Sequence, residues 1–287
     1  MTERVLLIGC GDLGQRVARR FLARGDHVHA LRRQPPDDDS GIQWLQGDIT
    51  RADSLTALPS GVTLLIHLPA PGGRDPALYR GVFIDGLHNV LNLLDTSRLK
   101  RVVFVSSSAV YGEHHGDWVT EDTPPAPQGF NGKILLEAEA ALAARGLSST
   151  ALRLAGLYGP GRLQLIERLR SGAAGAPTQP EHWANRIHID DAAAAVVHLA
   201  LLPKLEPVYI GCDDTPLPLH TLYADLAAMI GAPAPRIAPA PANVGSKKLS
   251  NARLRASGFT LQWPDSRQGY AAVLRVAGAR VPDKPQA

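Results

Sequence analysis

Residues 4–14 read RVLLIGCGDLG, an apolar run followed by three glycines in the spacing GxGxxG. Such a run is typical of a strand that is covered on both faces of a parallel sheet. Gly9 permits a tight turn, Gly11 lets the backbone approach a pyrophosphate, and Gly14 lets the next helix pack on the strand. The N-terminus of that helix supplies free N–H groups and partial positive charge. The pattern predicts a dinucleotide site, rather than a purely structural turn, formed by Gly9, Gly11, Asp12, Leu13 and Gly14.

Further short apolar runs alternate with helical patterns, which favours βαβ units and a parallel sheet. The predicted strands span residues 4–8, 27–31, 42–45, 62–67, 101–106, 149–154 and 207–210. The predicted helices span residues 12–24, 76–97, 131–145, 190–202, 217–230 and 266–278. We expect an α/β fold, a Rossmann-type doubly wound parallel sheet in the strand order 3-2-1-4-5-6 with an added edge strand and a small C-terminal lobe. The expected domains are a dinucleotide-binding Rossmann domain, residues 1–158 with 186–210, and a small substrate-side lobe, residues 159–185 with 211–287.

The composition is that of an ordinary globular protein. Hydrophobic residues make up 45% of the 287 residues and charged residues 20%, which excludes an intrinsically disordered chain. No apolar run approaches the ~20 residues of a membrane span, and no targeting segment is expected. The net charge of +3 is mild and nucleic-acid motifs are absent, so we expect neither a nucleic-acid nor a membrane partner. Two cysteines cannot build a disulfide framework, which favours a cytoplasmic protein, and no residue cluster has metal-ligand spacing.

The second predicted strand ends in Arg32 and Arg33, and Arg32 lies eighteen residues beyond Gly14. An acidic residue at this place accepts hydrogen bonds from the ribose hydroxyls of NAD, whereas a cation suits the 2′-phosphate of NADP. A guanidinium can hold that phosphate through two hydrogen bonds. The two arginines therefore favour NADP(H), with NAD(H) as the alternative; in the other interpretation they are solvated residues at a strand end.

Several segments, taken in chain order, resemble the NAD(P)-dependent epimerase/dehydratase group of the extended and atypical short-chain dehydrogenase/reductase families. They are GDIT at 47–50, HLPA at 67–70, VSSSAVYG at 105–112, the stretch 153–161 and RIHIDD at 186–191. The resemblance covers nearly the whole chain and implies an NAD(P) cofactor. It also implies cofactor contacts from Asp48, Ile49, Leu68, Pro69, Ala70, Ser106, Lys133 and Leu154.

The same resemblance implies a catalytic set. In the family a serine holds the substrate oxygen, a tyrosine transfers a proton, and a lysine four residues later lowers the tyrosine pKa and holds the nicotinamide ribose. Ser107 matches the serine and Lys133 the lysine, which puts the tyrosine at position 129, where this chain has glycine. The proton would then move through the substrate, through water or through another side chain, with Tyr111, Tyr158, His114 and His115 as candidates. The expected catalytic residues are Ser107, Lys133 and Tyr111.

Two functions are consistent with these residues. The first is an oxidoreductase or epimerase/dehydratase that moves hydride to or from a carbonyl or alcohol carbon of a small, sugar-like substrate. The second is a catalytically silent NADP(H)-binding redox sensor or partner-binding module. General acid–base assistance typically contributes ~10²–10⁴-fold, so losing the tyrosine weakens an enzyme without abolishing hydride transfer.

The resemblance also bears on the substrate and on assembly. Ala184 stands where sugar-nucleotide enzymes of the family carry an arginine for the diphosphate, which argues against a nucleotide-sugar substrate. Family members often dimerise through helices such as 76–97 and 131–145, so the resemblance implies a homodimer.

Overall fold

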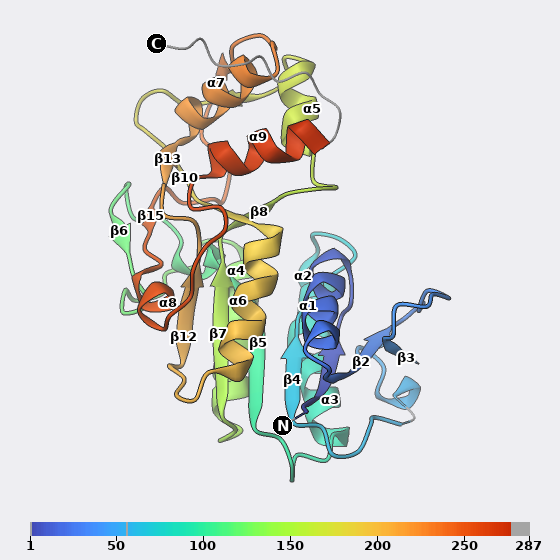
Figure 1. Ribbon diagram of the computed structural model, residues 1–287. Helices are drawn as coiled ribbons and strands as arrows, with labels where there is room; N and C mark the ends of the chain where they lie inside the picture. Colours follow the sequence, from blue (N-terminus) through green and yellow to red (C-terminus); the bar gives the residue numbers. More distant parts are fainter. Residues whose placement is uncertain (1, 56, 277–287) are drawn as a thin grey trace. The chain divides into compact units, whose positions relative to one another are not determined.

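The structure is a computed structural model that describes residues 2–55 and 57–276 (Figure 1). The chain divides into two compact units. The first unit comprises the described parts of Met1–Val110, Phe130–Arg153 and Ala193–Tyr209. The second unit comprises the described parts of Tyr111–Gly129, Leu154–Ala192 and Ile210–Ala287. The end of the predicted lobe and of the predicted helix 266–278, from residue 277 on, lies outside the described residues.

A seven-stranded parallel sheet dominates the first unit (Figure 1). Across the sheet its strands are β12 (Val208–Gly211), β7 (Ser149–Leu154), β5 (Arg101–Ser107), β4 (Leu64–His67), β1 (Arg4–Ile8), β2 (His27–Arg32) and β3 (Gln43–Gln46). This confirms the predicted Rossmann-type order, with β7 as the sixth strand and β12 as the added edge strand. In β1 the residues Val5–Ile8 are fully buried, as its unbroken apolar run predicts for a central strand.

Helices connect these strands in the expected places. They are α1 (Asp12–Ala23), the short 3₁₀ turn η1 (Ala52–Ser54), α2 (Pro76–Arg80), the π-helical turn η2 (Gly81–Asp85), α3 (Gly86–Leu93), α4 (Phe130–Ala143) and α6 (Ile189–Leu201). Helix α1 packs on β1 and β2, and α4 packs on β5, α2 and η2. In Figure 1, α1 and α6 lie in front of the sheet.

The helix predicted over 76–97 differs from the prediction in its middle and at its end. Asp75 caps its start by accepting hydrogen bonds from the N–H groups of Ala77 and Leu78 at 2.9 and 3.0 Å. The π-helical turn η2 then interrupts the α-helical pattern, and α3 ends at Leu93. At Gly86, the first residue after η2, a Cβ would lie 2.7 Å from Ile49 Cδ1, so the glycine lets α3 pack closely on Ile49.

The second unit contains short helices and two- or three-residue strands. Its helices are α5 (Gln164–Arg170), α7 (Leu219–Met229), α8 (Ala252–Ala256) and α9 (Ser266–Val276). The 3₁₀ turn η3 (Ser108–Tyr111) ends at Tyr111, the residue with which the second unit begins. Its strands are β6 (Trp118–Val119), β8 (Gly156–Tyr158), β9 (Gly175–Ala176), β10 (Trp183–Ala184), β11 (Arg186–His188), β13 (Leu217–Pro218), β14 (Arg236–Ile237) and β15 (Lys248–Leu249). They form the pairs β10–β13, β8–β11, β9–β14 and β6–β15. An apolar core that includes Tyr158, Ile166, Leu222, Tyr270 and Leu274 lies beneath α5, α7 and α9.

A buried ionic network joins three elements of the first unit. Glu139 on α4 accepts a hydrogen bond from Ser106 Oγ of β5 at 2.5 Å. The same carboxylate pairs with Arg153 of β7, whose Nη2 lies 2.6 Å from Glu139 Oε2, and the two side chains are only 5% and 8% exposed. A buried charge is tolerated only when it is paired and hydrogen-bonded, so the network fixes α4 against β5 and β7.

Replacement of Arg153 by methionine tests this network. The change leaves the Glu139 carboxylate buried without its cation, so we expect the free energy of unfolding to fall by about 3–5 kcal/mol in urea denaturation. The matched control is Arg80→Met. Arg80 of α2 pairs with Glu137, which lies on α4 like Glu139, at 2.7 Å, but both side chains are about half exposed. Its loss should cost about 0–1 kcal/mol. Equal losses in the two variants would show that burial of the Glu139 pair is unimportant.

A buried carboxyl group anchors the start of α9 in the second unit. Asp213 is 2% exposed and accepts hydrogen bonds from the N–H groups of Ser266 at 3.0 Å and Thr215 at 3.3 Å. Burial raises the pKa of Asp213 to about 7, although these hydrogen bonds oppose the rise. A raised folded-state pKa means that the contribution of this group to stability is fully present below its ordinary pKa near 4 and is lost as the pH rises through about 7.

We therefore expect the unfolding free energy of the parent protein to fall, relative to that of Asp213→Asn, as the pH rises from 4 to 7. The fall should be up to roughly 1.4 kcal/mol per pH unit. Asp53→Asn is the control. Hydrogen bonds from Arg51 hold the pKa of the exposed Asp53 carboxylate below its ordinary value. Its contribution is lost only as the pH falls through that lowered value, so the difference between Asp53→Asn and the parent protein should stay constant between pH 4 and pH 7. A constant difference for Asp213→Asn as well would contradict the prediction.

Candidate functional site

The carboxyl ends of β1, β2 and β4 meet at one edge of the sheet in the first unit. Ile8 of β1 is in register with Leu31 of β2 on one side and His67 of β4 on the other. The next residues continue the contact, since Gly9 N–H donates to Leu31 O at 3.3 Å and Leu68 N–H donates to Ile8 O at 2.9 Å. The strand order reverses between β1 and β4, and in open α/β sheets such a switch point is where ligands bind.

The three glycines of the opening segment have different surroundings. Gly9 has a φ of +86°, and a Cβ there would collide with the backbone of Pro69. A Cβ on Gly14 would lie 2.7 Å from Gly9 O and 2.9 Å from Leu68 Cδ1, so only glycine allows α1 to pack this closely. A Cβ on Gly11 would meet no described atom within 4 Å. The turn is therefore tight where it contacts β4 and open at Gly11, as the approach of a pyrophosphate requires.

The start of α1 is open to an anion. Gly11 is the N-cap residue, and no described side chain caps the helix there. The Asp12 carboxylate lies 3.0 Å from Arg16 Nε on the helix surface. Cys10 is buried, and burial raises its pKa to about 11, with the charge of Arg32 opposing the rise. The thiol thus stays neutral and does not place a negative charge beside the helix start. The N–H groups and the helix dipole therefore remain available to a phosphate.

Arg32 projects from the end of β2 beside this turn. Its guanidinium carbon lies 6.0 Å from the ring centroid of Trp44, and its charge acts on Cys10. The nearby carboxylate of Asp38 accepts hydrogen bonds at Oδ1 from Ser40 Oγ and from Trp44 Nε1, the latter at 3.1 Å. Arg32 is half-buried, Arg33 is exposed, and neither forms an ion pair within the described ranges 2–55 and 57–276.

Ser106 and Ser107 at the end of β5 have different partners. Ser106 is buried, and its hydroxyl is used by Glu139. Ser107 is half-buried, and its Oγ accepts the N–H of Ala109 at 3.2 Å. Because that bond uses a lone pair, the Ser107 hydroxyl proton remains available for an acceptor such as a substrate oxygen.

Lys133 lies in the first turn of α4, with its side chain exposed. It borders a hollow of about 360 Å³ together with Phe130, Ile134 and Glu137. Glu137 lies four residues on, but both of its oxygens are bound by Arg80 at 2.7 and 2.8 Å. Among the described residues, no carboxylate pairs with the Lys133 ammonium.

The remaining predicted residues differ in exposure. Asp48 accepts hydrogen bonds from Thr50 N at 3.0 Å and Thr50 Oγ1 at 2.8 Å, so it holds its own turn. Ile49 and Leu68 are buried, Pro69 is half-buried and Ala70 is exposed. His67, before Leu68, is fully buried and stacks on Phe104, and burial lowers its pKa to about 3, which keeps it neutral.

Two predicted residues, Tyr111 and Leu154, belong to the second unit. Tyr111 is fully buried, and its backbone O lies 2.9 Å from His114 Nε2. Leu154 is 5% exposed. In the first unit, by contrast, direct contacts bring Gly9, Gly14, Leu68 and Pro69 together, and Glu139 joins the elements that carry Ser107 and Lys133.

Sequence reasoning missed Glu139 and Trp44. A signal for Glu139 existed, because Arg153 is the single charge in the apolar strand STALRL, and a buried arginine needs a carboxylate. Trp44 left no local signal, since its place beside Arg32 follows from the pairing of β2 with β3.

The chain resembles known proteins along most of its length. The model of the NAD dependent epimerase/dehydratase family matches residues 5–210. Protein YeeZ of Escherichia coli K12 is 30% identical over 280 residues, which cover 92% of this chain and 97% of YeeZ. A solved structure from Methylobacillus flagellatus with the same family description is 40% identical, has a TM-score of 0.81, and covers 97% of this chain and 100% of its own.

A more distant relative has a named activity. The 2-alkyl-3-oxoalkanoate reductase of Stenotrophomonas maltophilia is 27% identical over 249 residues, which cover 78% of this chain and 74% of the reductase. Together with the glycine turn at the switch point, these matches show that the chain belongs to the NAD dependent epimerase/dehydratase family.

Proposed function

We propose that the protein binds NADP(H) at the turn Gly9–Gly14 and transfers hydride to or from a carbonyl or alcohol carbon of a small substrate. The observation that carries the proposal is the turn itself, which is closed against Pro69 and Leu68 but open at Gly11. The same unit holds the Ser107 hydroxyl and the Lys133 ammonium, both without an acceptor among the described residues. The named reductase among the relatives supports a reaction of this class.

Arg32 supports the preference for NADP(H). It is a cation beside the glycine turn at the place where NAD-dependent proteins use an acid. The nearby Asp38 carboxylate is held by Ser40 and Trp44 and forms no ion pair with Arg32. A 2′-phosphate would receive two hydrogen bonds from the guanidinium.

The residues of the first unit have separate roles in this reaction. The first turn of α1 would hold the pyrophosphate through its N–H groups. Lys133 would hold the nicotinamide ribose, and the Ser107 hydroxyl would donate a hydrogen bond to the substrate oxygen and fix the carbonyl in place. When bound, the cofactor supplies the hydride donor or acceptor at its nicotinamide ring.

The proton requires a different source from the tyrosine that the family uses, because position 129 is Gly129. Tyr111 stays the proposed donor, although it is fully buried, so proton transfer through it needs a local opening of η3. Tyr158 is a weaker candidate as a base, because burial raises its pKa far above the ordinary value. A slow enzyme is expected, since acid–base assistance is typically worth ~10²–10⁴-fold.

Gly129 also favours a second candidate function. A protein that binds NADP(H) tightly and turns over no carbonyl compound would act as a redox sensor. It would need the glycine turn and Arg32, but neither the Ser107 hydroxyl nor a proton donor.

The cofactor preference is tested with Arg32→Asp. Loss of the charge-assisted hydrogen bonds should weaken NADPH binding by roughly 10- to 100-fold, and NADH binding should change by less than about threefold. The control is Arg98→Asp. Arg98 is exposed and precedes β5, so it lies at the amino ends of the strands, away from the carboxyl ends that carry the glycine turn. Fluorescence titration measures both dissociation constants. Equal weakening of NADPH and NADH would contradict the assignment of Arg32 to the 2′-phosphate.

Ser107→Ala separates the enzyme from the sensor. With NADPH and a panel of aldehydes and ketones, the parent protein should oxidise the cofactor, and Ser107→Ala should lower kcat/KM by about 10²-fold while NADPH binding is kept. Ser108→Ala, the half-buried neighbour, is the control and should keep full activity. Tight NADPH binding by the parent protein without turnover of any compound would favour the sensor.

A further inference from the structure

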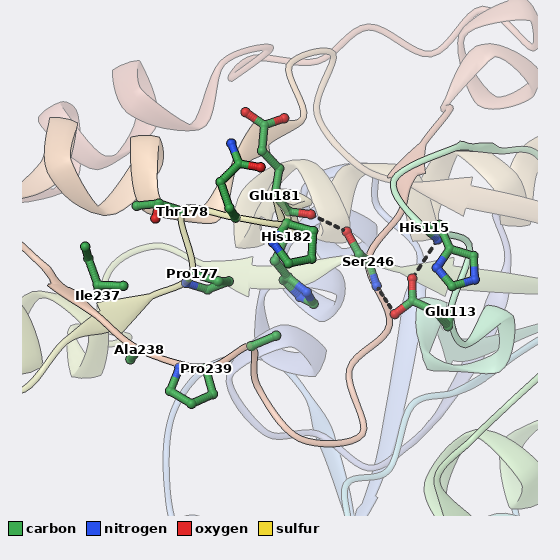
Figure 2. A pocket seen from close by; sticks show the side chains of 13 residues that line it. Glu113, His115, Pro177, Thr178, Glu181, His182, Ile237, Ala238, Pro239 and Ser246 are labelled. Atoms are coloured by element: carbon green, nitrogen blue, oxygen red, sulfur yellow. Dashed lines mark hydrogen bonds between the residues drawn. The ribbon is translucent and has the colours of Figure 1, made fainter.

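The second unit contains a pocket of about 590 Å³ that the reaction described above does not use (Figure 2). Its walls come from two proline-containing loops, residues 177–182 and 237–240, and from the segments around Glu113 and Ser246. The two loops meet because β9 and β14 pair in parallel, with Gly175 opposite Arg236 and Ala176 opposite Ile237. A volume of this size suits a small organic molecule.

Much of the pocket lining is apolar. Its apolar side chains are those of Pro177, Pro180, Ile237, Ala238, Pro239 and Ala240. Figure 2 shows Ile237, Ala238 and Pro239 on the side opposite Glu113. The Ile237 side chain is 77% exposed. Covering that side chain with hydrocarbon would remove apolar surface from water.

The opposite wall is polar and carries a fixed hydrogen-bond acceptor. The Glu113 carboxylate accepts the N–H of Ser246 at 3.0 Å and the N–H of His115 at 2.6 Å (Figure 2). Burial opposes ionisation of Glu113, but these N–H groups outweigh it and hold its pKa below the ordinary value. Each oxygen keeps a further lone pair, so the carboxylate can accept a hydrogen bond from a ligand.

The charges at the pocket disfavour anions. Two carboxylates, those of Glu113 and Glu181, line it, and no lysine or arginine of the described chain does. His182 is buried, and burial lowers its pKa and keeps it neutral. Lys247 follows Ser246 but is 5% exposed, and its Nζ donates to Gly112 O and Gly245 O at 3.0 and 3.1 Å. A phosphate in the pocket would therefore meet negative charge without a cation to pair with.

We propose that this pocket binds an amphipathic small molecule that bears a hydroxyl or amino group and no phosphate or carboxylate. The hydrocarbon part lies against Ile237 and the proline wall, and the O–H or N–H group donates to Glu113. The proposal goes beyond the proposed function, because it assigns to the second unit a ligand site of its own that does not depend on the glycine turn of the first unit.

Titration calorimetry without cofactor tests the pocket with three probes of one chain length: 1-octanol, octylamine and octyl phosphate. We expect the alcohol and the amine to bind and octyl phosphate to bind at least about 10-fold more weakly. Ile237→Glu should weaken 1-octanol by about 10-fold, because it places a charge on the apolar wall. Val244→Glu is the matched control, since Val244 is an exposed apolar residue outside the pocket and its change should leave 1-octanol binding unaltered.

Glu181→Lys tests the charge argument by itself. It replaces an exposed lining carboxylate with a cation, so the preference for 1-octanol over octyl phosphate should shrink by about threefold or more. Tighter binding of octyl phosphate or of UDP-glucose than of 1-octanol to the parent protein would overturn the proposal. So would equal effects of Ile237→Glu and Val244→Glu.

Different assays test the inference about the pocket and the proposed function. NADPH binding and turnover, measured on the same preparations, report on the glycine turn and Ser107. Loss of NADPH binding would remove the proposed function and leave the calorimetric result intact. Normal NADPH turnover, together with a preference of the pocket for octyl phosphate, would remove only the inference about the pocket.

Discussion

The structure of the first unit depends on how closely the turn after β1 approaches the end of β4. The absence of side chains at Gly9 and Gly14 allows this contact, because a Cβ at either position would overlap Pro69, Leu68 or the turn itself. The contact sets the start of α1 at the point where the sheet order reverses. Helix dipole, free N–H groups and the open side of Gly11 are thereby brought to one place. The preference for a dinucleotide follows from this backbone packing before any charged side chain contributes.

A second constraint orients the serine side chains at the end of β5 and the helix α4 beside them. Ser106 and Ser107 are neighbours on β5, so their side chains point to opposite sides of the strand. The inward hydroxyl of Ser106 is used to bind Glu139, which also binds Arg153. The hydroxyl of Ser107, on the other side, accepts the N–H of Ala109 and keeps its own proton for a further acceptor. The buried ionic network thus orients α4, on which Lys133 lies, relative to the strand that carries the serine.

The fold of the first unit could be predicted from the sequence, because local patterns determine it. Apolar runs, the glycine spacing and the alternation of strands with helices placed every strand of the sheet and its order. In the second unit the helical patterns at 217–230 and 266–278 predicted α7 and α9, but the strands could not be predicted in this way. Its strands are two or three residues long, and β9 pairs with β14 across some sixty residues, so no local periodicity marks them. Within the site, the glycines and Arg32 have local signatures, whereas Glu139 and Trp44 become partners only through tertiary pairing.

The pairing of β9 with β14 has a consequence for substitutions in the pocket of the second unit. Proline and alanine supply most of the apolar wall that it creates, and proline has no backbone N–H to contribute to the scaffold. Exchanges at these prolines would therefore remove no N–H group from the pairing of β9 with β14, to which Ala238 contributes by donating to Ala176 O at 3.2 Å. They would alter the lining of the pocket and leave the glycine turn of the other unit unchanged.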